Sequence, residues 1–547
     1  MGSIFSSVYS LWKIIAELNE EYRTILARLK RSPGLPVPHP TKPFWLDPPA
    51  SIANHQSPLP AHADIVIIGS GITGTSFARA LLDYEGKGEQ LTVIMLEARE
   101  TCSGATGRNG GHVNPPLYHD YAKMKKDHGV ETAKQIVCFR LSHMVELQRV
   151  ADEEGAVKHS QIRVVEGIDV FYAEKELEEA KEKVAIWKAD MPEESKGFYV
   201  VEGEEAVKKF GLSSRALGVI VTPAGAVHPY RLVTSVLSNL LKRHSNFHLS
   251  TNTPCTDIKP STSSNPYYTI QTPRGTITTP HVVHATNGWI PHLLPGFRTK
   301  ILPLRGLMSA QRPGRSLNPT SPPGCRSHIF YTGELGYDYL TQLPDGENEF
   351  MLGGGALSFG KIIPSEIGEG DDGSYNMSIA AHISGILPLY FGEENWGAEG
   401  RPVDVSVGGA RDPGSTDAAR VPWSEGRVKA IWTGILGFSV DGYPWVGRVP
   451  TKVSERPAPS AELVPLRKFT EKSQQVGDAL TAAPGEWMAA AYSGEGMVHA
   501  WQSGRALAYT VLGVEKETHM EEWFPEVMRV TEARWKKAKL EQLLGKL

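Results

Sequence analysis

The stretch ADIVIIGSGITG, residues 63–74, decides the fold of this 547-residue chain. It begins with a continuously apolar, β-branched run, which is typical of a central parallel strand covered on both faces. Gly69, Gly71 and Gly74 then permit a sharp turn, a close approach of backbone amides to a pyrophosphate, and tight helix packing. The next apolar run ends at Glu97, 23 residues after Gly74, where a carboxylate can bind ribose hydroxyls. The combination predicts a dinucleotide-binding unit, whereas an ordinary Gly-rich turn would leave Glu97 unexplained.

The composition is that of an ordinary globular protein. The chain is 40% hydrophobic and 22% charged, with a net charge of −4, so it is long enough for two or more cores and has no basic field for nucleic acid. No run approaches the roughly 18 to 20 apolar residues that span a bilayer. Its widely spaced cysteines, without CxxC pairs, predict a reducing compartment and no structural zinc or other metal site. They are Cys102, Cys138, Cys255 and Cys325.

Both ends of the chain bear on its location. Residues 4–29 place apolar side chains at helical spacing, which predicts an amphipathic helix within residues 1–31. We expect this helix to pack on the body or on a partner. The first six residues also match the myristoylation pattern at Gly2, so peripheral membrane contact is an alternative. Residues 545–547 differ at one position from a peroxisomal address, which leaves the peroxisome as an alternative to the expected cytoplasmic, intracellular location.

Between these ends, the sequence alternates between α/β and β-rich patterns. Nine prolines between residues 33 and 60 predict an extended strap or linker, so the folded body begins near residue 63. Residues 368–374 and 451–484 are polar and rich in glycine or proline, which predicts surface insertions. We expect helices over 118–151, 175–189 and 229–241, strands over 164–172, 247–250 and 282–285, hairpins over 268–279 and about Asp345-Gly346, and a separate sheet over 308–355.

A second glycine-rich stretch, SGATGRNGGH at residues 103–112, follows the strand that ends in Glu97. Four glycines in ten residues let the backbone wrap closely around a flat or anionic ligand. Thr106 and Arg108 are candidate phosphate donors, and Asn109 can both donate and accept hydrogen bonds. The natural occupant of such a loop is the flavin half of FAD.

At this point the chain resembles the FAD-dependent oxidoreductases of the D-amino-acid oxidase superfamily, in particular the branch with glycine, sarcosine and γ-glutamylputrescine oxidases. The resemblance covers roughly residues 43–512, and its specificity comes from the order of the motifs rather than from any one of them. The matching motifs are FWL (44–46), GSGITG (69–74), EA (97–98), SGATGRNGGH (103–112), GAVHP (225–229), ATNGW (285–289), LPLRG (302–306), WTG (432–434), DGYP (441–444) and SGEGM (493–497).

The resemblance implies a mixed fold, α/β combined with α+β. A discontinuous Rossmann-like FAD-binding domain carries an inserted β-sheet substrate domain. The implied division is a helix at 1–31, a Pro-rich linker at 32–62, an FAD-binding domain from 63–160, 205–300 and 429–515, a substrate domain from 161–204 and 301–428, and a helical C-terminal tail at 516–547.

The resemblance also implies the residues that hold the cofactor. Backbone amides of Ile72 and Thr73 face the pyrophosphate, Glu97 the adenosine ribose, and the start of the last helix at 494–497 the flavin C2 carbonyl. Noncovalent FAD is expected, because neither 107–108 nor 432–440 contains a histidine or cysteine. The implied set is Gly69, Ser70, Gly71, Ile72, Thr73, Gly74, Glu97, Ala98, Thr106, Gly107, Arg108, Asn109, Gly110, Cys255, Gly494, Glu495, Gly496 and Met497, with Cys255 as a packing residue beside adenine and Asn109 and Gly110 near the isoalloxazine ring.

Two departures from the family pattern matter. The C-terminal motif commonly reads Gly-His-Gly-Met, but this chain places Glu495 there, a carboxylate that would disfavour anionic reduced flavin unless it is protonated or turned to a partner. Sarcosine oxidases have a lysine near the flavin that assists oxygen activation, and Met351 takes the approximate position of that lysine here. The resemblance therefore supports the substrate oxidation more directly than it supports oxygen as the electron acceptor.

The predicted activity is oxidation of a C–N bond of an amine or amino acid to an imine, with hydride transfer to flavin N5 and reoxidation by O2 to give H2O2. The candidate substrate pocket contains Arg305, Tyr337, Tyr339 and Trp432, where the aromatic side chains would form a wall for the amine and Arg305 would hold a carboxylate. Each of the four has the alternative of a core residue. His112 and His228 are expected to fix loops.

Three other functions stay open on the sequence alone. One is a flavin dehydrogenase that passes electrons to an acceptor other than oxygen. Another is a non-catalytic, FAD-stabilised membrane-associated or interaction protein whose N-terminal helix is the functional part. The third is an NAD(P) enzyme, which would need a nicotinamide pocket where residues 103–112 fit flavin.

Overall fold

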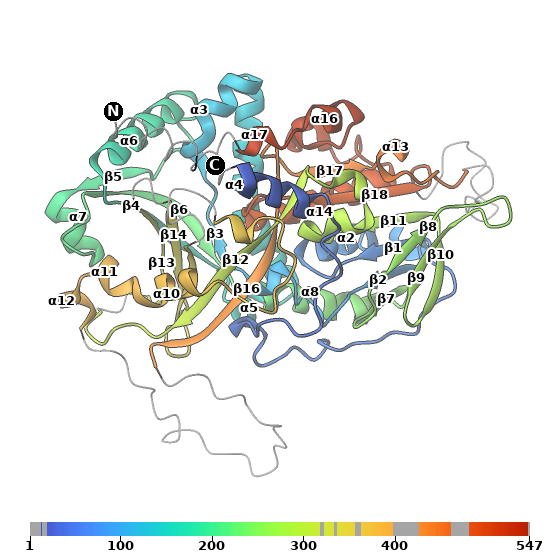
Figure 1. The fold of residues 1–547 in the computed structure, drawn as a ribbon, viewed down its shortest axis with the longest axis horizontal. Coiled ribbons are helices and arrows are strands. Elements are labelled where there is room, and N and C mark those ends of the chain that lie inside the picture. The colour runs from blue at the N-terminus through green and yellow to red at the C-terminus, as the bar shows by residue number, and fades with distance from the viewer. Residues whose placement is uncertain are drawn as a thin grey trace, which may run out of the picture.

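The computed structural model describes residue 13 and residues 19–317, 322–332, 336–355, 363–397, 426–460 and 481–544. Gly2, most of the predicted N-terminal helix before residue 19, part of the predicted insertion at 451–484 and residues 545–547 lie outside this set. Two large sheets lie side by side in the molecule (Figure 1).

The first sheet has six strands and contains the GxGxxG motif. Its order is β17-β18-β11-β1-β2-β7, with all neighbours parallel except β17 and β18. The first strand, β1, is fully buried and pairs with β2 and β11 on its two sides, as its apolar run predicts. The strands are β1 (Ile65–Ile68), β2 (Val93–Leu96), β7 (Phe247–Ser250), β11 (His281–His284), β17 (Trp445–Arg448) and β18 (Gly485–Ala490).

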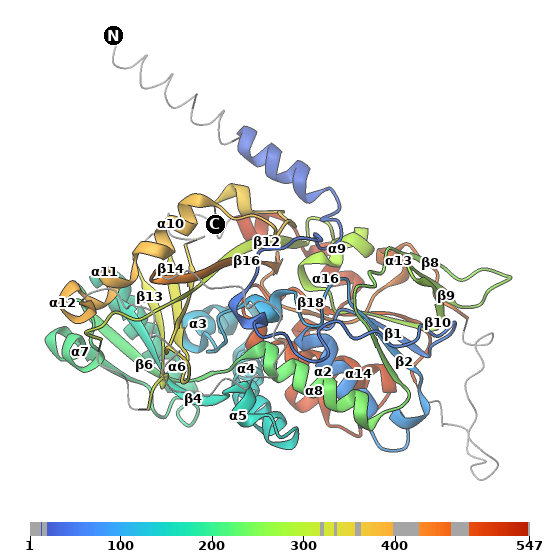
Figure 2. The same cartoon turned by 90° about the horizontal axis from the view of Figure 1, so that it is seen from below.

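Helix α2 (Ile72–Leu82) follows the GxGxxG turn and packs against α14 (Ala500–Leu512), near the other end of the chain. Their close approach depends on Gly504, because a Cβ there would lie 2.5 Å from the Thr73 carbonyl oxygen. Helix α8 (Pro229–Arg243) contacts α2, and Figure 2 shows α2, α8 and α14 together beneath the six-stranded sheet.

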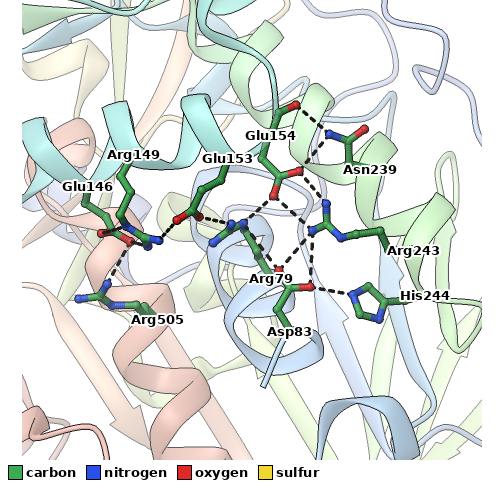
Figure 3. A network of polar contacts seen from close by, with 10 residues as sticks. All are labelled: Arg79, Asp83, Glu146, Arg149, Glu153, Glu154, Asn239, Arg243, His244 and Arg505. Atoms are coloured by element: carbon green, nitrogen blue, oxygen red, sulfur yellow. Dashed lines mark hydrogen bonds and ion pairs between the residues drawn. The ribbon is translucent and has the colours of Figure 1, made fainter. Parts of the chain in front are cut away.

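A network of ion pairs around one buried carboxylate joins this helical layer to α4 (Val130–Glu153) (Figure 3). Its centre is Glu154, whose side chain is 1% exposed and binds Arg79 Nε at 2.7 Å and Arg243 Nη1 at 2.8 Å. Arginines from α2 and α8 thus meet one carboxylate just after α4. The other members drawn are Asp83, Glu146, Arg149, Glu153, Asn239, His244 and Arg505.

The second sheet follows the order β16-β12-β15-β14-β13-β4-β6-β3, with β5 paired to β6. The predicted turn at Asp345-Gly346 is confirmed, because it joins β14 to its antiparallel neighbour β15. The strands are β3 (His112–Val113), β4 (Arg163–Phe171), β5 (Tyr199–Glu202), β6 (Gly218–Ala226), β12 (Ile301–Gln311), β13 (Arg326–Tyr331), β14 (Tyr337–Gln342), β15 (Phe350–Gly354) and β16 (Val428–Ser439).

A small sheet contains the other predicted hairpin, which is also confirmed: β9 (Tyr268–Thr272) pairs with β10 (Gly275–Thr279), and β8 (Asp257–Lys259) pairs with β9. The remaining α-helices are α3 (Leu117–His128), α5 (Val157–Ser160), α6 (Glu174–Asp190), α7 (Gly203–Phe210), α9 (Ile290–Leu293), α10 (Met377–Gly385), α11 (Leu387–Phe391), α12 (Glu393–Trp396), α13 (Thr451–Ser454), α15 (Met520–Trp523), α16 (Glu532–Lys537) and α17 (Glu541–Leu544). Among the described helices, none has the length and apolar character that a membrane crossing needs.

Strand pairing departs from the expected domain division at three strands. β3, β6 and β16 fall within segments assigned to the FAD-binding domain, yet all three belong to the second sheet. The reason is pairing: β6 runs antiparallel along the whole of β4, and β16 runs antiparallel along β12, so each completes a ladder that its partner strand begins. The chain therefore crosses between the sheets within these segments.

The N-terminal strap and residues 368–374 lie together on the body. The prediction of a surface insertion at 368–374 was wrong for Asp372, whose side chain is 0% exposed and forms an ion pair with Arg99. Its backbone oxygen accepts hydrogen bonds from the Thr41 amide and hydroxyl, which anchors the strap. Ahead of the strap, the helix at 19–29 projects from the body and buries only Ile25 and Leu29 (Figure 2).

Candidate active site

A deep cavity opens where the carboxyl ends of β1, β2 and β11 meet. This is the position where open α/β sheets bind ligands, because the loops after parallel strands converge there. The wall includes Gly69 and Gly71 after β1, Glu97 and Ala98 after β2, and Ala285, Thr286 and Asn287 after β11. Ile72, Thr73, Thr106, Asn109, Cys255, Tyr492, Gly494, Gly496 and Met497 complete the wall near the predicted motifs. We call this space the cofactor cavity.

The glycine-rich turn has the close contacts that the motif predicts. Gly69 has φ +108°, a conformation that favours glycine. A side chain at Gly74 would collide with the Gly69 carbonyl oxygen, so only glycine lets α2 pack this near the turn. The Ile72 amide at the start of α2 donates to Thr106 Oγ1 at 3.0 Å, which links the two glycine-rich stretches.

Glu97 lines the cofactor cavity directly after β2. One carboxylate oxygen accepts from the Ser70 amide at 3.1 Å and from the Ser70 hydroxyl at 2.7 Å. The other oxygen accepts from the Arg99 amide at 3.1 Å. These donors fix the carboxylate at the cavity wall, while Ser70 itself is fully buried behind it.

The strap supplies part of the cofactor cavity, which the sequence did not predict. Gly34, Leu35 and Pro36 line it opposite the strand ends. The nearby Val37 carbonyl accepts a hydrogen bond from Arg99 Nη1 at 3.3 Å. The prolines that indicated an extended segment gave no sign of where that segment would lie.

A second cavity of about 430 Å³ continues from the first. The two share the wall residues Ala105, Asn109, Leu436, Gly494 and Met497, so a flat group at this boundary would face both spaces. We call the second space the substrate cavity. Its polar lining includes His112, His119, Tyr331, Tyr337, Tyr339 and Glu495, and its apolar lining includes Leu304, Leu307, Met308, Ile329, Phe438 and Val498.

The structure brings two of the four predicted pocket residues together. Tyr337 and Tyr339 both line the substrate cavity from β14. Burial raises the pKa of Tyr337 to about 12 and also raises the pKa of Tyr339, so both phenols stay neutral and can donate hydrogen bonds.

Arg305 and Trp432 have other surroundings. Arg305 Nε binds the Glu366 carboxylate at 2.6 Å, and its Nη1 donates to the Asp371 carbonyl. The Trp432 ring is fully buried and donates from Nε1 to the Arg108 carbonyl at 2.9 Å. Both side chains therefore have structural partners, and neither is among the residues that line the two cavities.

Arg108 lines the substrate cavity, but its guanidinium donates hydrogen bonds to backbone carbonyls of the protein. Nε donates to the Ser103 carbonyl at 2.7 Å, and Nη1 donates to the Thr41 and Thr433 carbonyls at 2.9 and 2.8 Å. Burial lowers the pKa of Arg108 to about 10, and the neighbouring Asp372 opposes this shift. The group predicted as a phosphate donor thus joins the glycine-rich stretch to the strap and to β16.

The other predicted cofactor residues divide between the wall and the packing behind it. Gly107 packs under Cys102 and Leu46, where a side chain would collide with the Cys102 carbonyl oxygen. Cys255 lines the cofactor cavity, and burial raises the pKa of its thiol to about 12, which keeps it unreactive. Gly110 lines the substrate cavity. Met351 is fully buried in β15.

Both histidines expected to fix loops are neutral for the same reason. Burial lowers the pKa of His112 to about 3 and holds that of His228 well below its usual value. His112 Nδ1 is 2.8 Å from the Ser327 hydroxyl, and His228 caps α8 by accepting from the Arg231 amide. His112 also lines the substrate cavity.

One polar cluster at the substrate cavity was missed by the sequence reasoning. His119 Nε2 lies 2.9 Å from the Tyr331 hydroxyl and 3.3 Å from Asp169 Oδ2, and the Tyr118 hydroxyl donates to the same carboxylate oxygen at 2.6 Å. These side chains come from α3, β4 and β13, and no local motif links them. The pairing of β4 with β13 places Tyr331 close to Asp169, and α3 adds Tyr118 and His119 to them.

With this geometry established, comparison with known proteins identifies the class. The family described as FAD dependent oxidoreductase (DAO) matches residues 64–510, so the chain belongs to that family of FAD-dependent enzymes. Probable oxidoreductase OrdL of Rhizobium meliloti (strain 1021) is 22% identical over 264 residues, 45% of this chain and 54% of that protein. Gamma-glutamylputrescine oxidoreductase of Escherichia coli (strain K12) is 25% identical over 234 residues, 42% of this chain and 49% of that protein. The chain thus spans about half the length of these two relatives.

A solved structure agrees with the fold. Glycine oxidase from Geobacillus kaustophilus superposes with a TM-score of 0.55 at 15% identity, over 82% of this chain and 95% of that one. At this identity the likeness concerns the fold alone.

The residues of the cofactor cavity fit FAD. A helix of eleven residues begins at the glycine turn, as a pyrophosphate requires, and Glu97 presents a carboxylate of the type that binds ribose. Thr286 Oγ1 and Trp289 Nε1 line the cavity and are buried without a hydrogen-bond partner among the described residues, so both are available to a polar ligand. In the described part of the chain, no cluster of three or more His, Cys, Asp or Glu side chains is arranged for a metal ion.

Proposed function

We propose that this enzyme oxidises the C–N bond of a small amine or amino acid to an imine, which water converts to a carbonyl compound and a free amine. The observation that carries the proposal is the continuity of the two cavities at Asn109, Gly494 and Met497. When bound, FAD supplies the hydride acceptor of such an oxidation. The named relatives that act on an amine-containing compound, such as γ-glutamylputrescine, support the choice of substrate class.

The chain itself would bind and orient the amine. Tyr337 and Tyr339 offer neutral hydroxyls and aromatic faces, which suit a polar nitrogen on a small carbon skeleton. Leu304, Met308 and Phe438 supply an apolar wall that keeps water away from the reacting carbon. We propose that FAD is bound noncovalently, since residues 107–108 and 432–440 have no histidine or cysteine.

We further propose O2 as the electron acceptor, with H2O2 as product. The position of Met351 inside β15 favours testing a second possibility, a dehydrogenase that passes electrons to another acceptor. Both versions predict the same first half-reaction. They differ only in what happens when air is admitted.

The test is an anaerobic screen of FAD-loaded protein with primary, secondary and N-methyl amines and amino acids, following the flavin absorbance band. Bleaching by at least one compound is expected, and bleaching by none would contradict the proposed oxidation. Admission of oxygen then separates the two acceptors, because rapid recovery with stoichiometric peroxide marks an oxidase. Recovery only with an artificial acceptor marks a dehydrogenase.

A further inference from the structure

Glu495 is the acidic residue at the junction of the two cavities. It lies in the loop between β18 and α14, next to Gly494 and near Met497, which line both spaces. Its side chain is 34% exposed toward the substrate cavity. A carboxylate here would face any group bound at the flavin boundary.

The cation nearest to Glu495 is already neutralised by another acid. Arg140 donates from Nη1 and Nη2 to the two oxygens of Asp120, each at 2.9 Å, whereas its distance to Glu495 Oε2 is 3.5 Å. Arg140 Nε donates to His499 Nε2 at 3.3 Å. When Asp120 and Glu495 are both ionised, the cluster of two carboxylates and the Arg140 guanidinium therefore carries one negative charge in excess.

The other groups around Glu495 in the described part of the chain do not supply a counter-charge. His499 Nδ1 lies 3.0 Å from the Glu495 carbonyl, and burial holds the pKa of His499 well below its usual value, so the ring is neutral. Tyr331 and Tyr337 face Glu495 from β13 and β14, and both are neutral phenols with raised pKa values. The excess charge is thus directed at the cavity.

Burial also adjusts the proton affinity of Glu495. It raises the pKa of this carboxyl to about 7; Arg140 opposes the rise and Asp120 adds to it. A carboxyl with this property can exchange a proton near neutral pH. An alkylamine, with a pKa of about 10, arrives as an ammonium ion, which cannot lose hydride until one N–H proton has left.

We propose that Glu495 binds the ammonium nitrogen of the substrate and accepts one proton from it. The N–H bond breaks, an O–H bond forms on the Glu495 carboxylate, and nitrogen keeps the electron pair as a neutral amine. No electron is transferred in this step. The inference rests on the proposed amine oxidation and narrows it: the site recognises its substrate by the cationic nitrogen, while the Arg108 guanidinium in the same cavity is occupied by backbone carbonyls.

A ligand that cannot be oxidised tests binding separately from turnover. tert-Butylamine has no hydrogen on the carbon bonded to nitrogen, and 2-methylpropan-2-ol is its neutral counterpart. Binding to FAD-loaded protein is measured by calorimetry and by perturbation of the flavin spectrum, from roughly pH 5.5 to 9. We expect the affinity for the amine to be constant above pH 7 and to fall about tenfold per pH unit below it, as Glu495 takes up a proton.

Three variants complete the test. Glu495→Gln should weaken amine binding at pH 8 at least about tenfold, remove the fall below pH 7 and leave alcohol binding unchanged. Glu495→Asp should retain the pH dependence of amine affinity, which would show that a carboxylate at this position is required. Glu131→Gln, which removes an exposed charge from the helix that contains Arg140, is the matched control and should behave like the parent protein. FAD content and melting temperature check that each variant is folded.

Amine binding to Glu495→Gln with the parent's affinity and pH dependence would overturn the proposal. A failure of this proposal gives a different result from a failure of the proposed function. If amines bleach the flavin equally fast in Glu495→Gln and in the parent, the oxidation stands and Glu495 has no part in it. If no amine bleaches the parent flavin, the oxidation fails, and the tert-butylamine titration decides separately whether Glu495 recognises a cation.

Discussion

Replacing Asp372 with asparagine should loosen the strap over the cofactor cavity. The carboxylate is 0% exposed and receives Nη1 and Nη2 of Arg99, each at 2.9 Å, while Arg108 Nε lies 3.5 Å away. The side chains of Arg99 and Arg108 are 9% and 1% exposed. Asparagine keeps the shape, but it removes a negative charge that lies against two buried cations, and it turns an amide N–H toward a guanidinium donor.

The expected cost follows from this geometry. Two opposite charges about 4 Å apart attract by about 4 kcal/mol in surroundings of intermediate polarity. Deleting one partner of a buried ion pair destabilises proteins by about 3–5 kcal/mol, because the other charge stays buried without compensation. We therefore expect Asp372→Asn to lower the free energy of unfolding by about 3 kcal/mol or more.

The same change should speed the release of FAD. Arg99 also donates to the Val37 carbonyl, and Asp372 holds Thr41, so the strap is fixed directly after the residues that line the cavity. Chemical unfolding measures stability, and the rise of flavin fluorescence after dilution measures release. Asp371→Asn is the matched control, since its Oδ1 accepts from the Gly373 amide and an asparagine can do the same. If Asp372→Asn matched this control in both measurements, the clamp would have no energetic role.

Two further substitutions test the packing of the cofactor domain. Gly504→Ala should cost about 1–3 kcal/mol, because the new methyl lies 2.5 Å from the Thr73 carbonyl oxygen and must push α14 from α2; thermal unfolding checks this, and an unchanged melting temperature would contradict it. Glu486 is held by His284 and Arg456, which lower its pKa to about 2. Its depressed pKa contributes stability that is present above about pH 4.5 and lost as the pH falls toward 2, about 3 kcal/mol in all. Glu486→Gln should flatten that part of the stability curve in acid unfolding, and an unaltered slope would show that the carboxylate does not titrate there.

The glycine turn and the strands around the cofactor cavity could be predicted from the sequence, because the residues that decide their structure are close together in the chain. Gly69, Gly71 and Gly74 act within one turn, and the strands before and after them are continuous apolar runs. The hairpin at 268–279 has its turn residues between its own strands. In each case the residues that decide the structure lie within a few positions of one another.

The substrate end depends on partners that are distant in sequence. The sequence predicts Arg305 as a carboxylate ligand for the substrate, but the side chain of Glu366, 61 positions later, already binds its guanidinium. His119 of α3 meets Asp169 of β4, 50 positions later, and the parallel pairing of β4 with β13 adds Tyr331 to the same cluster. A sequence pattern reports the type of a side chain and its local backbone, but it does not report which opposite charge will already be in contact with that side chain.

The loop that joins the two cavities shows how the fold supports the proposed role of Glu495. Ala491 and Ser493 have φ values of +65° and +52°, left-handed conformations that cost non-glycine residues free energy and that persist only where the surroundings impose them. The Ala491 amide donates to Asn287 Oδ1 at 2.9 Å, and the Ser493 amide donates to the Gly437 carbonyl at 2.8 Å. The loop is thus fixed by residues that follow β11 in one sheet and lie in β16 of the other. A carboxylate on such a loop has a defined position relative to both cavities, which is what recognition of an ammonium group at their boundary requires.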